Sequence, residues 1–395
     1  MTWRALAAAL MALLCGTASA AEFYQGKQVT IVVGFSSGGT YDATARLFAR
    51  HLGKYLPGKP TVIVRNMPGA GSLIAAKSLH SSLPKDGTTI GVVGGGVALE
   101  PLLGNPQATY DPRRFNWIGG RTRDNFLCLV WHTVPVQTLQ DVIKRETVVG
   151  ATGPGSRTLT YPKVLNELLG TKFKIVMGYP GGNEITLALE RGEVEGYCGW
   201  ALGSIKTRAP EWIRDGKIRP LAQFTLGKAD LPNVPLATDL AGTENGRRAI
   251  EFLAADSVLA WPLVAPPDIP AEHLIELRTA FNAMMQDPWL LAEAAAQGLD
   301  VDPVSGAEIA AAGRSTLWHA AGGPRTCPQD QRVSLAGMAC TRCRRLPPTL
   351  TPAVRTPSAH ITDRQTAVAW DGPRAGPGRG RTEQSSPVTL GASVT

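Results

Sequence analysis

Short apolar segments that run through a glycine-rich loop into an amphipathic segment recur along this chain, and this pattern most limits its possible folds. The first copy covers residues 29–46, where strand-favouring Val29–Val33 precedes the loop GFSSGGT and a helical pattern of apolar positions. A strand that enters a helix through such a loop leaves backbone N–H groups unpaired beside the positive end of the helix dipole. The first copy therefore predicts an anion site, sized for a carboxylate or a phosphate.

The same loop also admits an enzymatic interpretation. Residues 34–38 read Gly-Phe-Ser-Ser-Gly and match G-x-S-x-G, the nucleophile motif of α/β-hydrolases, in the strand-turn-helix context that the motif requires. A hydrolase would use Ser36 as its nucleophile and would need a downstream acid and a histidine. The candidate histidines have no distinctive motif around them; they are His51, His80, His132 and His273. We therefore favour a binding loop, with a serine hydrolase that uses Ser36 as the alternative.

The alternation continues through the first third of the chain. Expected strands at 61–65 and 88–93 are followed, like the first, by glycine-rich loops at 68–71 and 94–96. Such alternation predicts an α/β fold with a mostly parallel sheet that helices cover on both faces. Because ligands in open α/β sheets lie beyond the carboxyl ends of the strands, we expect the loops to meet at one edge.

A second unit with the same pattern begins near Asp124. It contains a small-residue turn at 152–157 and another glycine-rich loop at 178–184. Two α/β lobes with facing loops predict a ligand cleft between them that closes on the ligand. A later segment, with an expected strand at 257–264, is predicted to return to the first lobe.

The expected division of the chain starts with a signal peptide. Arg4 precedes an apolar run and an A-x-A cleavage pattern, too short to span a bilayer, so the mature protein is expected to be exported to the periplasm. The predicted parts are a signal peptide at 1–20, the first lobe at 21–124 and 251–313, the second lobe at 125–250, and a tail at 314–395.

The tail differs from the rest in composition. Of the net charge of +8, +7 falls on residues from Arg314 onward, where arginine replaces lysine completely. Its Arg/Pro-rich composition predicts disorder, and the abrupt change also fits an altered reading frame. Because the preceding residues are nearly neutral, nucleic-acid binding is not expected.

The cysteines leave two possibilities open. Cys128 and Cys198 lie in apolar, strand-like runs and form either a disulfide or two buried thiols. Cys340 and Cys343 have a metal-type spacing but match no recognised zinc pattern. The sequence therefore predicts neither a metal site nor a cofactor.

Several segments, in order, carry a family resemblance. They are YQGKQVTIVV (24–33), Gly38-Gly39 with Asp42 and Arg46, VRNMPGAG (64–71), KDG (85–87), ATGPGS (151–156), GYPGG (178–182), LPNVP (231–235) and LVAP (263–266). With these segments the chain resembles the periplasmic solute receptors of tripartite tricarboxylate transporters, also called Bug receptors. The resemblance implies a two-lobed, periplasmic-binding-protein-like (type II) fold that closes on a small carboxylate and delivers it to a two-component membrane permease.

The resemblance leaves the ligand and the exact role open. Thr40 and Tyr41 replace a small Gly-Thr pair of the family's loop, so the identity of the carboxylate does not transfer. A ligand sensor for a signalling partner is a second, non-enzymatic alternative to transport. We expect a monomer.

The predicted ligand-binding residues come from the loops of both lobes. They are Ser36, Ser37, Gly38, Gly39, Thr40, Tyr41, Asp42 and Gly94 in the first lobe, and Thr152, Gly153, Ser156, Arg157, Tyr179, Gly181 and Gly182 in the second. Asp42 is expected either to recognise a ligand amine or to stabilise the first helical turn. Arg157 is expected either to clamp a carboxylate or to be a solvated surface arginine.

Overall fold

The computed structural model of the chain describes residues 23–226 and 230–314. All of these residues belong to one compact unit, Met1–Ala339. The predicted signal peptide, the tail beyond Arg314 and the Cys340/Cys343 pair lie outside the described residues. None of the described helices is long and apolar enough to cross a bilayer.

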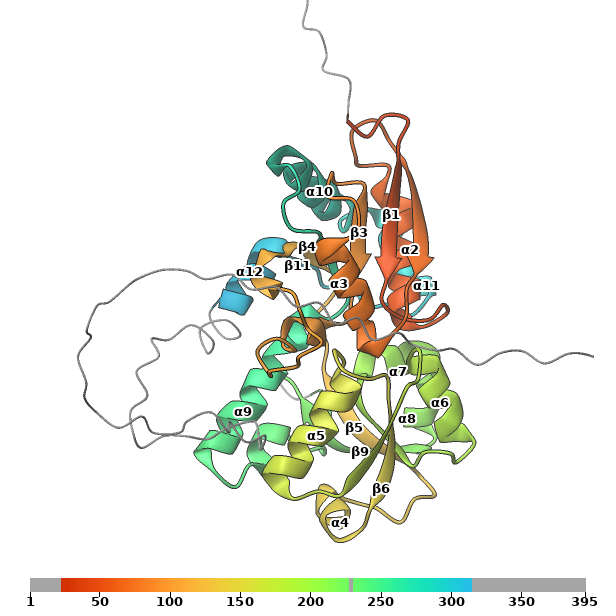
Figure 1. The fold of residues 1–395 in the computed structure, drawn as a ribbon. Helices are drawn as coiled ribbons and strands as arrows, with labels where there is room; N and C mark the ends of the chain where they lie inside the picture. The colour runs from red at the N-terminus through yellow and green to blue at the C-terminus, as the bar shows by residue number, and fades with distance from the viewer. Residues whose placement is uncertain (1–22, 227–229, 315–395) are drawn as a thin grey trace, which may run out of the picture. The chain divides into compact units, whose positions relative to one another are not determined.

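Two mixed β-sheets organise the described residues (Figure 1). In spatial order, the first sheet contains β11 (Val304–Ser305), β4 (Asn116–Gly120), β10 (Pro262–Ala265), β3 (Thr89–Val92), β1 (Gln28–Val33) and β2 (Thr61–Asn66). The second contains β7 (Phe173–Met177), β6 (Thr147–Ala151), β8 (Gly196–Ala201), β5 (Phe126–Trp131) and β9 (Ile218–Phe224). The fold is therefore mixed α/β and two-lobed, and the first sheet takes strands from both ends of the described chain.

The prediction of a mostly parallel sheet is wrong for the later strands. β1 pairs in parallel with β2 and β3, and β6 with β7 and β8, as the strand–loop–helix pattern predicts. In contrast, β10 runs antiparallel to β3 and β4, and β5 runs antiparallel to β8 and β9. Since β5 and β10 follow segments that cross from one sheet to the other, they enter their sheets in the reversed direction.

Helices cover both sheets (Figure 1). They are α2 (Thr40–Leu52), α3 (Leu73–Ser81), α4 (Leu139–Lys144), α5 (Arg157–Leu169), α6 (Gly182–Glu190), α7 (Leu202–Arg208), α8 (Pro210–Arg214), α9 (Glu244–Ala254), α10 (Ala271–Met284), α11 (Pro288–Ala296) and α12 (Gly306–Ala312). The apolar face that the sequence predicts for α2 packs against α10, where the rings of Phe48 and Phe281 meet edge to face at 5.7 Å. This core holds the C-terminal half of α2, whose N-terminal end follows the loop after β1.

The return segment differs from its predicted strand at 257–264. A 3₁₀ helix, η5 (Ala255–Leu259), comes first, and β10 begins only at Pro262. Between them Trp261 has a φ of +49°, a left-handed conformation that ends any regular strand. The 3₁₀ helix, which replaces the predicted strand here, places the fully buried Asp256 in an ion pair with Arg157.

The structure joins Cys128 of β5 and Cys198 of β8 in a disulfide. The two residues lie opposite each other in the antiparallel ladder, and both are buried. Of the two possibilities that the sequence left open, the structure thus contains the cross-strand bond.

Candidate functional site

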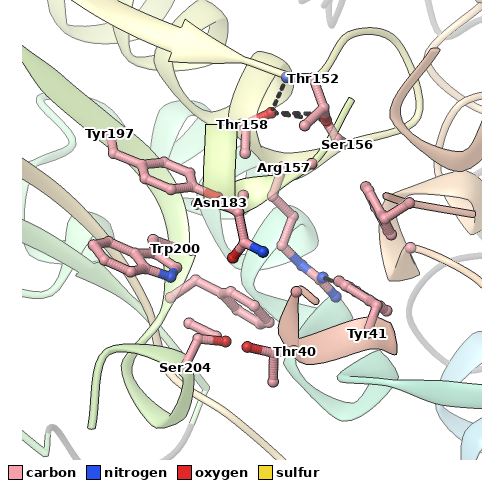
Figure 2. A pocket seen from close by; sticks show the side chains of 18 of the residues that line it. Thr40, Tyr41, Thr152, Ser156, Arg157, Thr158, Asn183, Tyr197, Trp200 and Ser204 are labelled. Atoms are coloured by element: carbon pink, nitrogen blue, oxygen red, sulfur yellow. Dashed lines mark hydrogen bonds between the residues drawn. The ribbon is translucent and has the colours of Figure 1, made fainter. Parts of the chain in front are cut away.

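A cavity lies where the loops after β1 and β3 meet the loops and helices of the second sheet (Figure 2). Its lining residues are Phe35, Ser36, Gly39, Thr40, Tyr41, Gly94, Gly96, Phe126, Thr152, Gly155, Ser156, Arg157, Thr158, Gly181, Gly182, Asn183, Thr186, Tyr197, Gly199, Trp200, Ala201, Ser204, Arg208 and Trp261. The cavity leaves about 80 Å³ for the centres of water molecules. Because one water needs roughly 10–15 Å³ by this measure, the space suits a small organic molecule.

Helix N-termini from both lobes open onto the cavity. α2, α5 and α6 begin beside it, after Gly39, Ser156 and Gly181 respectively. Gly39 and Gly181 have no side chain that could cap a helix, and the Ser156 hydroxyl donates to the Gly153 carbonyl instead. No N-cap side chain therefore occupies the first-turn N–H groups of these helices. Together with the helix dipoles, they give the cavity an anion-binding character that requires no positively charged side chain.

The turn before α5 is held in shape by its own hydroxyl groups (Figure 2). The backbone N–H of Thr152 donates to Thr158 Oγ1 at 2.9 Å, and the Ser156 and Thr158 hydroxyls lie 2.7 Å apart. Ser156 Oγ also donates to the Gly153 carbonyl at 2.7 Å. This network fixes the N-terminus of α5 at the cavity wall.

Arg157 is a buried member of an ion pair. The residue is 5% exposed, and its Nε lies 2.6 Å from Asp256 Oδ2, in a residue that is 0% exposed. Tyr161 donates to the other Asp256 oxygen at 2.8 Å, and the guanidinium lies 3.9 Å from the centre of the Phe126 ring. Burial alone would lower the pKa of Arg157, but the negative charge of Asp256 together with the interactions with Tyr41 and Tyr161 raises the pKa above its ordinary value, so the arginine is charged. The surface-arginine alternative is therefore wrong.

Contacts between the lobes surround the cavity. The Ser36 hydroxyl donates to Glu184 Oε2 at 3.0 Å, and Arg157 Nη1 donates to the Tyr41 hydroxyl at 3.3 Å. Arg208, at the last position of α7, donates to the Gly38 carbonyl. Each of these hydrogen bonds joins the first lobe to the second.

Ten of the fifteen predicted ligand-binding residues line the cavity, and five do not. Those that line it are Ser36, Gly39, Thr40, Tyr41, Gly94, Thr152, Ser156, Arg157, Gly181 and Gly182. Those that do not are Ser37, Gly38, Asp42, Gly153 and Tyr179. A role in ligand binding stays a prediction for all of them.

The carboxylate of Asp42 already accepts hydrogen bonds from other groups of the protein. It accepts from the Gly38 N–H at 2.8 Å, from Arg46 Nε at 2.8 Å and from Asn66 Nδ2 at 2.9 Å. Burial would raise the pKa of Asp42, but the hydrogen bonds from Arg46, Gly38 and Asn66 together hold it below its usual value. The carboxylate therefore shapes the loop after β1 from outside the cavity.

Sequence reasoning missed most of the wall that the second lobe contributes. Tyr197 and Trp200 of β8 line the cavity with their rings stacked at 4.9 Å, and Ser204 and Arg208 reach it from α7. The sequence predicts neither α7 nor its direction. For Trp200 the sequence offers two interpretations, a place in the cleft or hinge and packing in the core, and its apolar run favours the core; the structure places it in the cavity lining.

The geometry around Ser36 lacks the parts of a serine hydrolase. Among the residues that line the cavity there is no histidine. Of the described candidates, His51 bonds to Glu293 at 2.7 Å and His273 to the Asp86 carbonyl at 2.7 Å, both away from the cavity. Ser36 instead bonds to Glu184.

Residues 44–311 match the sequence model of a protein family, the tripartite tricarboxylate transporter family receptor. A similar curated protein is the UPF0065 protein in the TAR-I ttuE-ttuC' intergenic region of Agrobacterium vitis, 29% identical over 72% of this chain and 79% of its own length.

Solved structures share the fold. The periplasmic binding protein BugD is 21% identical, with 74% of this chain and 95% of that chain covered and a TM-score of 0.59. MatC of Rhodopseudomonas palustris, solved with malate, is 22% identical, with 74% of this chain and 97% of that chain covered and a TM-score of 0.57. An R. palustris protein solved with adipate is 24% identical, with 74% of this chain and 94% of that chain covered and a TM-score of 0.57.

Proposed function

Because this chain belongs to the tripartite tricarboxylate transporter receptor family, we propose that it captures a small carboxylate between its lobes and delivers it to a two-component membrane permease. The family consists of solute-binding receptors. For the chain itself, we propose that it works in the periplasm, as a monomer, after removal of the predicted signal peptide.

One observation carries the carboxylate proposal. The N-termini of α2, α5 and α6 open onto a cavity whose lining contains Arg157 and Arg208 and, within the described residues, no aspartate or glutamate. An anion there would meet dipoles and N–H donors from both lobes at once. Binding would thus favour the closed form, because only closure brings the N-terminus of α2 to those of α5 and α6. The relatives solved with malate and adipate are consistent with such a ligand.

A thermal-shift titration of the full chain tests the proposal. The probes are adipate, succinate, citrate and benzoate, each paired with its uncharged amide. A ligand that binds only the folded form raises the melting temperature as its concentration increases. At 100 times Kd it adds about 2.7 kcal/mol to the free energy of unfolding. We expect at least one acid to shift the transition while its amide does not. Absence of any shift at millimolar acid would refute the carboxylate receptor.

Reaction with a fluorophosphonate probe tests the hydrolase alternative. An activated serine nucleophile would be labelled at Ser36, whereas a serine that only donates hydrogen bonds would not. We expect no labelling of Ser36, and rapid stoichiometric labelling there would favour the hydrolase.

A further inference from the structure

Several polar side chains at the cavity wall have no hydrogen-bond partner in the part of the chain that the structure describes. Thr40, Tyr197, Trp200 and Ser204 are each at least nine-tenths buried, with exposed fractions of 8%, 4%, 5% and 5%, and all of them line the cavity. Within the described residues, none of their side-chain hydroxyl or N–H groups makes a hydrogen bond. Buried polar groups are nearly always paired, so such a set points to a ligand as the partner.

The groups converge from both lobes (Figure 2). Thr40 is the first residue of α2 in the first lobe, while Ser204 lies in the first turn of α7 in the second. Figure 2 shows their two hydroxyl oxygens turned toward each other, with the Asn183 amide and the Trp200 indole nitrogen facing the same space. We name Thr40, Asn183, Trp200 and Ser204 the neutral cluster.

The neutral cluster can both donate hydrogen bonds to a ligand and accept them from it. Hydroxyl and amide groups can both donate to a ligand and accept from it, and the indole N–H only donates. A ligand hydroxyl can use both capacities, because it donates one hydrogen bond and accepts others.

The charges around the cavity disfavour an ammonium group. Its charged lining residues are both arginines, Arg157 and Arg208. Asp256 pairs with Arg157, and Glu184 and Asp42 lie outside the lining. A ligand ammonium would therefore be desolvated beside two positive charges, with no acid in the cavity lining to pair with it.

We infer that the neutral cluster recognises an uncharged hydroxyl of the ligand, so that the receptor prefers hydroxy-carboxylates to the matching unsubstituted acids and rejects the matching amino acids. The inference rests on the proposed function and specifies its ligand class. A site built to bond a ligand hydroxyl disfavours an analogue that lacks it, because the site's own polar groups are then left unpaired.

Two matched triples of probes test the inference by calorimetric titration of the full chain. One is L-malate, succinate and L-aspartate; the other, suited to the aromatic walls, is phenyllactate, phenylpropionate and phenylalanine. Within a triple the carbon skeleton is constant, and the group beside the carboxylate is hydroxyl, hydrogen or ammonium. We expect the hydroxy acid to bind roughly tenfold more tightly than the unsubstituted acid, as one good hydrogen bond allows. The amino acid should bind more weakly than both.

Variants assign the preference to the cluster. Thr40→Val and Ser204→Ala, one in each lobe, should each reduce affinity for the hydroxy acid about three- to tenfold and leave the unsubstituted acid nearly unchanged. The matched control is Thr44→Val, one turn further along α2, because Thr44 is fully buried and does not line the cavity. A general loss of packing would instead weaken all ligands equally.

The outcomes separate this inference from the proposed function. Equal binding of hydroxy and unsubstituted acids, an amino acid that binds as tightly as the hydroxy acid, or an unchanged preference in both variants overturns the inference. Binding of adipate with none of the six probes bound also overturns it, while the receptor function stands. Failure of every acid refutes the function itself.

Discussion

At the scale of single residues, burial decides what the charged side chains can do. Sequence identified Arg157 as a candidate because it follows a small-residue turn, yet its partner Asp256 lies 99 residues further along the chain. No local pattern reveals such a pair. For Asp42 two partners, Gly38 and Arg46, lie within four residues, while the third, Asn66, lies 24 residues away.

The buried pair can be tested by removing one charge or both. Arg157→Met should destabilise the protein by about 3–5 kcal/mol, because it leaves the Asp256 carboxylate buried without a counter-charge. In Arg157→Met/Asp256→Asn the orphaned charge is gone and Tyr161 keeps a partner, so we expect a smaller loss. Urea unfolding at pH 7 measures both. Equal losses in the single and double variants would contradict the account.

Asp124 predicts a pH dependence of stability. Burial raises its pKa to about 6 from the model-peptide value of 3.8, against the opposing hydrogen bonds from Gly203 and Asn125 and the charge of Arg121. The folded protein therefore holds this proton to higher pH than the unfolded chain, so the contribution to stability is present below pH 4 and lost as pH rises to about 6. Two pKa units correspond to at most about 3 kcal/mol.

The matched variant is Asp124→Asn, which does not titrate. Unfolding free energies at pH 4, 5, 6 and 7 should fall more steeply with pH in the natural protein than in the variant. Parallel pH profiles would show that Asp124 keeps an ordinary pKa.

At the scale of elements, regular segments were predictable and the connections between lobes were not. The strands β1, β2 and β3 agree to within one residue at each end with the predicted ranges 29–33, 61–65 and 88–93, because strand-favouring apolar residues bounded by turn residues identify a strand by themselves. α7 was not predicted, and the return segment, which does add β10 to the first sheet, was expected as a strand from residue 257, where η5 lies instead. Long-range contacts determine both: Asp256 of η5 pairs with Arg157, and α7 follows directly from β8. The cavity wall that these elements build was missed for the same reason.

The disulfide gives a test at this scale. Cys128→Ala/Cys198→Ala should lose about 2–4 kcal/mol of stability, because the bond closes a segment of 70 residues and joins β5 to β8. Peptide mapping of the protein without reductant should recover the two residues as one linked pair. Free thiols at both positions, together with unchanged stability of the variant, would be incompatible with the bond.

At the scale of the whole molecule, the loops that sequence placed at one edge do meet, and the partner lobe completes the cavity. Sequence predicted the loops after β1, β3 and β6 because glycine and small polar residues mark them. Which residues face inward depends on how one lobe rests on the other, so the inward side of β8 and α7 required the structure. Closure is then a property of the contacts between the lobes, such as Ser36 with Glu184.

Weakening one of these contacts outside the cavity should weaken binding through closure alone. Glu184→Ala removes the acceptor of the Ser36 hydroxyl without changing a lining residue, and we expect a roughly three- to tenfold weaker affinity for the tightest acid of the screen. Glu190→Ala, on the exposed face of the same helix, is the control and should leave affinity unchanged. If both variants bind as the natural protein does, the Ser36–Glu184 contact does not contribute to closure.

Calorimetric titration of the full chain with the small carboxylate that most raises its melting temperature, and with the uncharged amide of that acid, tests the central claim most directly, because the two molecules differ in charge but hardly in size. The account predicts saturable binding of one acid for each chain and no heat of binding with the amide. Equal binding of both, or no binding of any small carboxylate at millimolar concentration, would contradict it.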